Sequence, residues 1–446
     1  LLETPMPIAR VALILLSIHL FLANINPLAL ASPISPGVIH TDPTQIHMGI
    51  RWQVSGDVNL DATCQVRFRK VGTPQWRDGL DLIRTHPDLH GQAADRPDNR
   101  FAGSLFFLET GTSYEIELTL NDPDGGGTRE TVTAATLHEM QAAADATEVH
   151  VIPGDGGGSG TTADPFRGLQ IACDNARPGT TIHLAAGTYA PFELTTSGEA
   201  DRPIVLRGPV DPHGNSDEAA WAIIDGQDTD RGVFTLGRYD IRTGHLIIED
   251  LVIQSGRWGI DAQNSHHILM RRCRVRDVDF GYYNRRDKGW ESHQMVMDSS
   301  FVGRTPWPGS GIPSERGIDL RGSGNIVAHN RISNFGDGIS LQPNTDAYGY
   351  ANDIYGNDIN EIVDDPIEID YNSCNTRVWR NRVTNGRMGI SLAPIYGGPV
   401  YVFRNQFFNL ESSAYKMNRD PAGLVIADPY GVGSILNDDT EILIEE

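Results

Sequence analysis

Two acidic side chains, Glu368 and Asp370, are separated by a single residue in a stretch that alternates between polar and aliphatic residues. Residues two apart on a β-strand point to the same face, so the two carboxylates would lie about 6 to 7 Å apart. Hydrolysis of a glycosidic bond with inversion uses two carboxyl groups about 6.5 to 9.5 Å apart, one protonated and one ionised. The pair therefore predicts a glycoside hydrolase, with Glu368 as general acid and Asp370 as general base.

The expected neighbours of the pair decide these roles. Arg321 and Gln342 are predicted beside Asp370 and would keep it ionised, whereas no cation is predicted in line with Glu368. Asp319 would position the substrate, and Arg285 or Arg321 would engage an acidic group on the sugar. Further substrate contacts are predicted for Gln342, Tyr283, Tyr371, Trp290 and Lys416, with Trp307 beside the long insertion that carries Trp290.

The acidic residues around this pair are also compatible with a second reaction. Asp364 and Asp365, together with Glu368 and Asp370, could hold Ca²⁺ through carboxylate oxygens. Arg285, Arg321 or Lys416 would then be the base, or the carboxylate clamp, of a β-elimination on a uronate polymer. A calcium-assisted lyase therefore stands beside the hydrolase as an alternative. A sugar epimerase and a non-catalytic glycan-binding or adhesion protein are further alternatives.

Two short repeats must position these residues. One reads Gly-Ile-polar-Leu, as in residues 317–320 and 338–341, and the other centres on an asparagine. The asparagines Asn330, Asn357, Asn381 and Asn405 are spaced by 27, 24 and 24 residues. A period of this size predicts stacked coils, in which asparagine tolerates a left-handed backbone and its amide bonds to the coils above and below.

Stacking aligns the outward residues of successive coils into columns. The first column is predicted to contain Asp261, Tyr283, Asp319, Ser340, Glu368, Ser391 and Lys416. The second is predicted to contain Gln263, Arg285, Arg321, Gln342, Asp370, Ala393 and Asn418.

These repeats, with the helix and strand pattern of residues 165–208, resemble the right-handed parallel β-helix of the pectin-lyase-like superfamily. The resemblance covers roughly residues 145–426 and implies the fold more than an activity. Glu368-Ile369-Asp370 is similar to the Glu-x-Asp pair of iota-carrageenases. Chondroitinase-B-like and alginate lyases use acids to hold calcium near a basic residue. The position of their lysine corresponds to Asn372, so that mechanism would need an arginine or a distant lysine here.

The chain as a whole is predicted to be all-β, with a β-sandwich at 33–138, a linker at 139–160 and a parallel β-helix at 161–446. The stretch Leu108 to Leu118, with Trp52 on an early strand, resembles a fibronectin type III domain and its tyrosine corner. That resemblance implies a spacer more than a carbohydrate-binding module.

The first residues have the pattern of a targeting segment. Arg10 precedes the apolar run Val11 to Leu22, and Ala29-Leu30-Ala31 provides the small residues of a cleavage site. Residues 1–31 are predicted to be a removed signal peptide, which implies a secreted or periplasmic protein.

Composition limits the partners. The 446 residues include 36 Lys+Arg and 58 Asp+Glu, a net charge of −22, which excludes a general nucleic-acid or anionic-membrane binder. We expect a polysaccharide partner and a monomer. The four cysteines lie about a hundred residues apart, so most are expected to be buried small side chains. His266-His267 and His329 lack the spacing of a metal site and are expected to be structural or solvated.

Overall fold

The computed structural model describes residues 32–85, 99–284, 292–342, 349–393, 395, 397–417 and 442–445. Its regular structure is almost entirely β-strand, with helix α1 (Leu169–Asn175) and the short 3₁₀ helix η3 (Glu218–Ala220) in the described ranges. The predicted all-β class is confirmed. The predicted signal peptide, residues 1–31, lies outside the described residues. No helix found in the described ranges is long and apolar enough to cross a membrane.

The N-terminal part is a sandwich of two antiparallel sheets, with strand orders β1-β2-β6-β5 and β4-β3-β7-β8. The strands are β1 (Ser35–Pro43), β2 (Met48–Ser55), β3 (Thr63–Lys70), β4 (Arg77–Asp78), β5 (Ile83–Thr85), β6 (Arg100–Leu105), β7 (Ser113–Asn121) and β8 (Thr128–Ala135). Trp52, Phe101 and Ile116 are fully buried between the sheets. The hydroxyl of Tyr114 accepts a hydrogen bond from the Glu109 N–H at 2.9 Å, the bond of a tyrosine corner. The more specific likeness to fibronectin type III remains a prediction.

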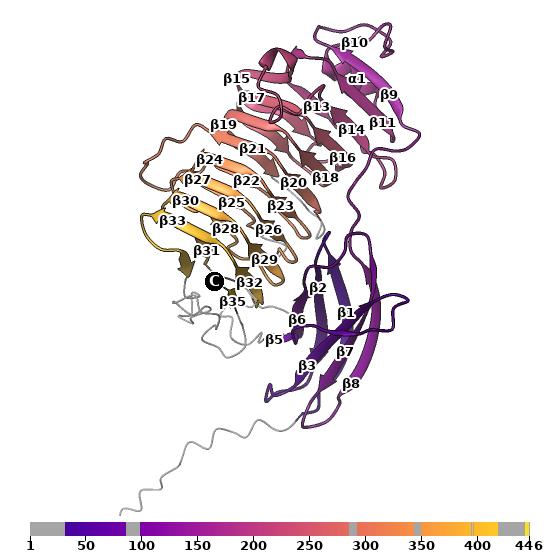
Figure 1. Ribbon diagram of the computed structural model, residues 1–446, viewed down its shortest axis with the longest axis vertical. Coiled ribbons are helices and arrows are strands. Elements are labelled where there is room, and N and C mark those ends of the chain that lie inside the picture. Colours follow the sequence, from indigo (N-terminus) through magenta and orange to yellow (C-terminus); the bar gives the residue numbers. More distant parts are fainter. Residues whose placement is uncertain are drawn as a thin grey trace, which may run out of the picture.

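The rest of the described chain coils into a parallel β-helix with three walls (Figure 1). The first wall is a 12-stranded sheet. Its strands are β9 (Thr147–Ile152), β10 (Phe166–Arg167), β11 (Thr180–Leu184), β14 (Ile204–Arg207), β16 (Thr243–Glu249), β18 (Ser265–Arg271), β20 (Gln294–Met297), β23 (Ile326–Ala328), β26 (Asp353–Tyr355), β29 (Thr376–Trp379), β32 (Val400–Phe403) and β35 (Ile442–Glu445). Strand β9 pairs in register with β11, so the first coil begins inside the segment 139–160 that was predicted to be a linker.

The second and third walls share three long strands, β15 (Ala222–Leu236), β17 (Leu251–Ala262) and β19 (Arg274–Asn284). The second wall adds β12 (Gly187–Tyr189), β21 (Ser300–Gly303), β24 (Arg331–Phe335), β27 (Asp358–Ile362), β30 (Arg382–Gly386) and β33 (Gln406–Leu410). The third wall adds β13 (Phe192–Leu194), β22 (Arg316–Asp319), β25 (Asp337–Ser340), β28 (Ile367–Glu368), β31 (Ile390–Leu392) and β34 (Tyr415–Met417).

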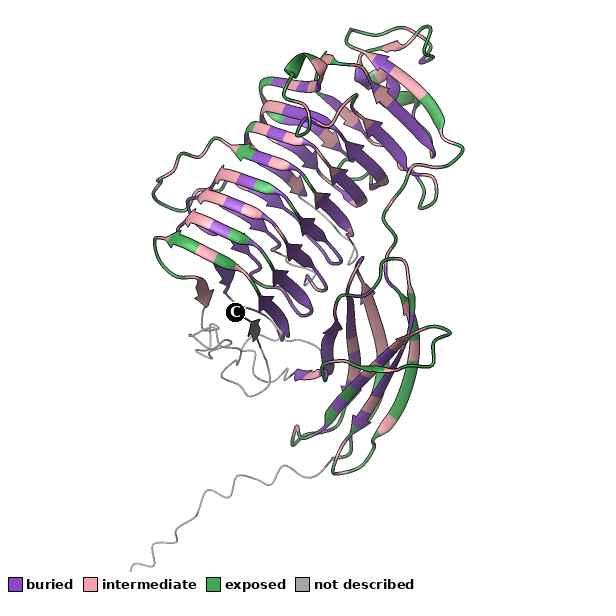
Figure 2. Cartoon of the chain, in the orientation of Figure 1, coloured by how far each residue is buried: buried purple, intermediate pink, exposed green. Residues whose placement is uncertain are grey.

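Aliphatic side chains fill the inside of the coils and form one continuous core, as the repeats predict. Figure 2 shows buried strand segments along the coils of the β-helix. The asparagine ladder is also present. The Asn357 side chain donates to Val327 O and to Asn381 Oδ1, both at 2.9 Å, and Asn330 Nδ2 donates to Asn357 Oδ1 at 3.1 Å. The backbone expectation was wrong, because the left-handed residue is the one before each asparagine, as at Arg380 with φ 54°.

The sandwich packs against the first wall near its C-terminal coils (Figure 1). Phe106, which follows β6, lies 4.8 Å from the ring of Tyr401 and 5.9 Å from that of Phe403. His47 Nδ1 lies 3.1 Å from Asp353 Oδ2, and Asp353 Oδ1 is 2.5 Å from Arg377 Nε, with all three side chains fully buried. Sandwich and β-helix therefore share an apolar and ionic interface.

All four cysteines, Cys64, Cys173, Cys273 and Cys374, are buried and free. They act as small core side chains, as expected.

Candidate active site on the third wall

The column predicted from the repeats is aligned as expected. Pairing places Asp261 opposite Tyr283, Tyr283 opposite Asp319, Asp319 opposite Ser340, Ser340 opposite Glu368, Glu368 opposite Ser391, and Ser391 opposite Lys416. Each member alternates with aliphatic residues that point into the core, such as Ile318, Leu320 and Ile367. The register therefore brings acidic, hydroxyl and cationic side chains together outside the coils.

The acids Asp319 and Glu368 of this column, and Asp370 of the second column, are much less exposed than an open outer face implies. The exposed fractions of Asp319, Glu368 and Asp370 are 0%, 6% and 5%. The carboxylates are covered because the side chains of Arg316 and Arg321 lie against them. A carboxylate in such a place must be paired, protonated or bound to a metal ion.

Arg316 bridges three successive coils. Its guanidinium lies 3.1 Å from Asp319 Oδ2, 3.0 Å from Asp337 Oδ2 and 3.7 Å from Glu368 Oε2. Neither Arg316 nor Asp337 was selected from the sequence. Alternation could not reveal them, because Arg316 and Asp337, which pair with each other, stand two residues before the inward Ile318 and Ile339 and would be assigned to the inner face.

Glu368 has one donor, Gln342, that was predicted for Asp370, and one, Ser340, from its own predicted column. Gln342 Nε2 donates to Glu368 Oε1 at 2.6 Å, and Ser340 Oγ donates to Oε2 at 2.8 Å. Arg321 pairs instead with Asp319 at 3.0 Å and donates to the Gln342 carbonyl. The predicted neighbours of the two acids were therefore wrong, since Glu368 sits among donors and close to a cation.

Asp370 lies in the more apolar place. Burial raises its pKa to about 7, although the Ala393 N–H and the Ser391 hydroxyl both donate to Oδ1 at 2.7 Å. Near neutral pH a large fraction of Asp370 therefore holds a proton, whereas the sequence predicted an ionised Asp370.

A second acidic group lies at the same place. Asp337, Asp364 and Asp365, all buried, each offer an oxygen within 4.8 Å of the others. Asp365 Oδ2 is 2.6 Å from Lys416 Nζ, and Asp364 Oδ1 is 3.3 Å from Arg387 Nη1. The other oxygen of Asp365 is buried and has no hydrogen-bond partner in the described part of the chain.

The charges of this acidic cluster do not balance. Burial raises the pKa of Asp364 and Asp365, and burial together with Glu368 raises that of Asp337 to about 8. Within the described residues, the six carboxylates Asp319, Asp337, Asp364, Asp365, Glu368 and Asp370 face the four cations Arg316, Arg321, Arg387 and Lys416. With all six ionised, two negative charges remain, and the raised pKa values of Asp337 and Asp370 mean that protons take up this excess near neutral pH unless a further cation does so. Oxygen ligands with an excess charge of two suit a hard divalent cation such as Ca²⁺.

The other predicted contacts lie at different distances from this cluster. Tyr283 stands one coil before Asp319, with its ring 5.0 Å from that of Phe280. Tyr371 follows Asp370 and is 41% exposed. Arg285 and Trp290 lie outside the described residues.

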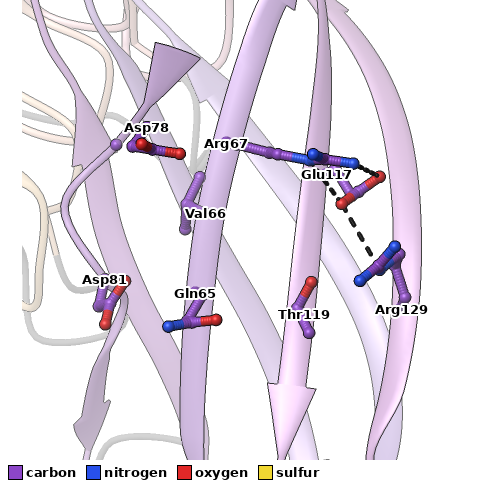
Figure 3. A pocket seen from close by; sticks show the side chains of 9 residues that line it. Gln65, Val66, Arg67, Asp78, Asp81, Glu117, Thr119 and Arg129 are labelled. Carbon is purple, nitrogen blue, oxygen red and sulfur yellow. Dashed lines mark hydrogen bonds and ion pairs between the residues drawn. The ribbon is translucent and has the colours of Figure 1, made fainter. Parts of the chain in front are cut away.

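Two cavities differ in their position relative to the acidic cluster. One of about 340 Å³ adjoins the cluster and is lined by Arg387, Val363, Gly311 and Glu411, among others. Another of about 440 Å³ lies on the sandwich, where Arg67 and Arg129 flank Glu117 (Figure 3). It is built from sandwich residues alone and does not contribute to the acidic cluster.

Comparison with known proteins agrees with this architecture. Residues 239–427 match the family model described as a right-handed β-helix region. The coils form a right-handed parallel β-helix. Over 221 residues the chain is 27% identical to pectate lyase PEL9 of Emericella nidulans, covering 44% of this chain and 50% of that protein. The match thus spans about half the length of this curated relative. A solved alginate lyase from Paenibacillus sp. str. FPU-7 aligns with a TM-score of 0.31 and 16% identity, over 56% of this chain and 94% of its own.

Proposed function

We propose that this chain cleaves a uronate-containing polysaccharide by β-elimination at the acidic cluster of the third wall. The observation that best supports this proposal is the contact of Lys416 with Asp365. This contact lies inside a buried group of carboxylates that outnumber the cations around them. The relative named pectate lyase supports a polysaccharide-degrading role and a lyase chemistry. Such a polymer lies outside cells, in keeping with the signal peptide predicted for residues 1–31.

Lys416 is the proposed base. β-Elimination requires a group that takes the proton next to the uronate carboxylate. Three of the four described cations at the cluster are arginines, which stay protonated in proteins. Lys416 can lose its proton. Burial works to lower its pKa, but Asp365 outweighs burial and holds the pKa above its usual range. Lys416 therefore becomes a better base when the charge of Asp365 is taken up by a ligand.

Asp337, Asp364 and Asp365 are the residues that would hold calcium. Bound Ca²⁺ would supply positive charge to the uronate carboxylate and stabilise the charge that builds up there as the proton leaves. The carboxylates fit this ion because they offer oxygen ligands, excess charge and one unpaired buried oxygen.

Each bond that breaks or forms in the elimination can then be assigned. The C5–H bond of the uronate breaks and its proton goes to Lys416 Nζ. The C4–C5 double bond forms as the C4–O glycosidic bond breaks, and the electron pair leaves on the glycosidic oxygen, which takes a proton from water. Arg387, which is partly exposed and lines the adjoining cavity, would bind the carboxylate of a neighbouring uronate.

Hydrolysis by Glu368 and Asp370 is the second candidate. It is favoured by the spacing of the pair and by Asp370, whose pKa of about 7 keeps part of it protonated near neutral pH, while Glu368 accepts hydrogen bonds from Gln342 and Ser340. In this mechanism Asp370 would be the acid and Glu368 the base.

One assay separates these chemistries. The protein is incubated with polygalacturonate, alginate, a glycosaminoglycan and neutral glucans, with Ca²⁺ or with a chelator. Ultraviolet absorbance of the unsaturated product and new reducing ends are followed together. A lyase produces both signals on an acidic polymer and loses both with the chelator. Reducing ends without absorbance would show a hydrolase. Retention on a glycan column with neither signal would show a binding protein.

A further inference from the structure

A group of histidines gathers on the first wall, outside the acidic cluster. His245 lies in β16, and His266 and His267 lie one coil later in β18. One ring nitrogen from each of the three lies within 4.8 Å of the others. His266 Nδ1 and His267 Nδ1 are 2.9 Å apart. The spacing along the chain did not indicate a metal site at His266-His267, because the third histidine, His245, comes from the neighbouring coil.

The backbone leaves room for this arrangement. Gly244 pairs with His266 across the two strands, and a Cβ at position 244 would lie 2.4 Å from His266 Nε2. The His266 ring therefore occupies the space that a side chain at position 244 would fill. His245 and His267 both have left-handed backbone, with φ of 55° and 51°. Their rings lie 4.8 Å apart between centroids.

The group is reached from a cavity of about 300 Å³ between the sandwich and the β-helix. His267 and His293 line this cavity from the first-wall side, and Asp42 of β1 lines it from the sandwich. The His293 ring lies 4.8 Å from that of His267. Of the three histidines, His267 lines this cavity, so an ion that enters it meets the group at His267.

We propose that His245, His266 and His267 bind a transition-metal ion of the zinc, nickel and copper class. Imidazole nitrogen suits these ions, whereas calcium selects oxygen, so this site and the acidic cluster take different metals. Nitrogen atoms bonded to zinc at about 2.0–2.1 Å stand about 3.4 Å from each other in a tetrahedron. The three nitrogens, now within 4.8 Å of one another, would adjust to that spacing on binding, and the remaining position would be taken by water or a fourth side chain.

The protonation state of the rings agrees with this role. Burial, with Arg242 and neighbouring histidines, lowers the pKa of His266 to about 4. Burial and His293 lower that of His267 to about 3. Metal ligation needs neutral imidazole, so these two rings are ready to bind at neutral pH without releasing protons.

Titration of the chelator-treated full chain, without a histidine tag, tests the site. Co²⁺ is added while its visible absorption is followed, and Zn²⁺ is then added as competitor. We expect one equivalent of Co²⁺ to bind with a nitrogen-type spectrum and to be displaced by Zn²⁺. His266→Ala and His267→Ala should each weaken binding by at least the 10- to 100-fold that follows loss of a partner of a metal ligand.

Two matched variants serve as controls. His329 packs over Gly356 in the way that His266 packs over Gly244, but belongs to no described metal group, so His329→Ala should bind Co²⁺ like the wild type. Asp365→Asn, in the acidic cluster, should also bind Co²⁺ normally, which keeps this test independent of the proposed lyase activity.

X-ray absorption of the Zn²⁺-loaded wild-type chain tests the same point without any variant. Three or more imidazole ligands per zinc would support the site, and fewer than three would overturn it. The proposal also fails if the wild type binds no Co²⁺, or if both histidine variants bind it as tightly as His329→Ala.

Discussion

The proposed calcium site depends most on Asp365. One of its oxygens contacts Lys416 and the other is buried without a partner in the described chain. Calcium at 100 times its Kd should stabilise the wild-type fold by about 2.7 kcal/mol and raise its Tm, because only the folded state assembles the three carboxylates. Asp365→Asn should lose most of that increase. Thermal unfolding with and without Ca²⁺ measures it.

The control for this prediction is Asp358→Asn, since Asp358 forms a surface pair with Arg382 on the second wall. It should keep the full response to calcium. An equal response in Asp365→Asn and Asp358→Asn, or no response in the wild type, would remove the metal from the account.

At the residue scale, the sequence predicted which side chains share a face but not what they contact. Alternation placed Asp319, Glu368 and Lys416 in one column, and pairing confirms that column. Their partners could not be predicted, because a guanidinium reaches across several coils. Arg316 contacts acids on three coils, and this reach depends on its rotamer and on burial.

The stacked turn is the element that sets the register of every coil. Asn357 accepts hydrogen bonds from the backbone and side chain of Asn330, and it donates to Val327 and Asn381. Asn357→Ala leaves several of these buried groups without partners, each at a cost of about 1–3 kcal/mol. We expect a loss of stability of at least that size. Urea unfolding followed by circular dichroism measures it.

Asn360 provides the comparison within the same coil. It is only half-buried, and its partners Thr384 and Asn385 can turn to water when its side chain is lost. Asn360→Ala should cost clearly less than Asn357→Ala. Equal losses from the two variants would mean that the ladder adds nothing beyond an ordinary polar contact.

The repeat period was enough to predict this element, and the reason is local. Each asparagine bonds to the coil 24 or 27 residues away, so the spacing in sequence is the spacing of the contact. The start of the β-helix was missed for the opposite reason. Strand β9 shows no period, because the Gly-rich segment and helix α1 separate it from β11.

At the scale of the whole molecule, the sandwich and the β-helix are joined by the buried group His47, Asp353 and Arg377. Burial works to raise the pKa of Asp353, but Arg377 and His47 outweigh it and hold the pKa well below its usual range. Asp353→Asn leaves Arg377 buried without its counter-charge and should cost about 3–5 kcal/mol at pH 7.

The sign of the pH dependence follows from the lowered pKa. The contribution of Asp353 is fully present above its unfolded pKa of about 3.9 and is lost as the pH falls below that value. Burial also lowers the pKa of His47, so its protonation destabilises the fold below about pH 6.5. The difference in unfolding free energy between wild type and Asp353→Asn should therefore shrink on acidification.

Urea unfolding at pH 7 and pH 3 measures this difference, with Asp145→Asn as the control because Asp145 makes an exposed pair with Arg202. A difference that is the same at both pH values would show that the fold does not lower the pKa of Asp353. The sequence could not predict this interface, because His47 and Asp353 are 306 residues apart and no repeat relates them.

The central claim is that Lys416, held against the acidic cluster, removes the proton in a calcium-assisted β-elimination. The most direct test is the initial rate of double-bond formation by wild type, Lys416→Ala and Lys70→Ala, on the acidic polymer that the wild type cleaves. Loss of a general base costs about 10²- to 10⁴-fold, so Lys416→Ala should fall by that factor while it still unfolds cooperatively. Lys70, paired with Glu109 on the sandwich, should be replaceable without loss. A Lys416→Ala variant that forms double bonds at the wild-type rate would contradict the account.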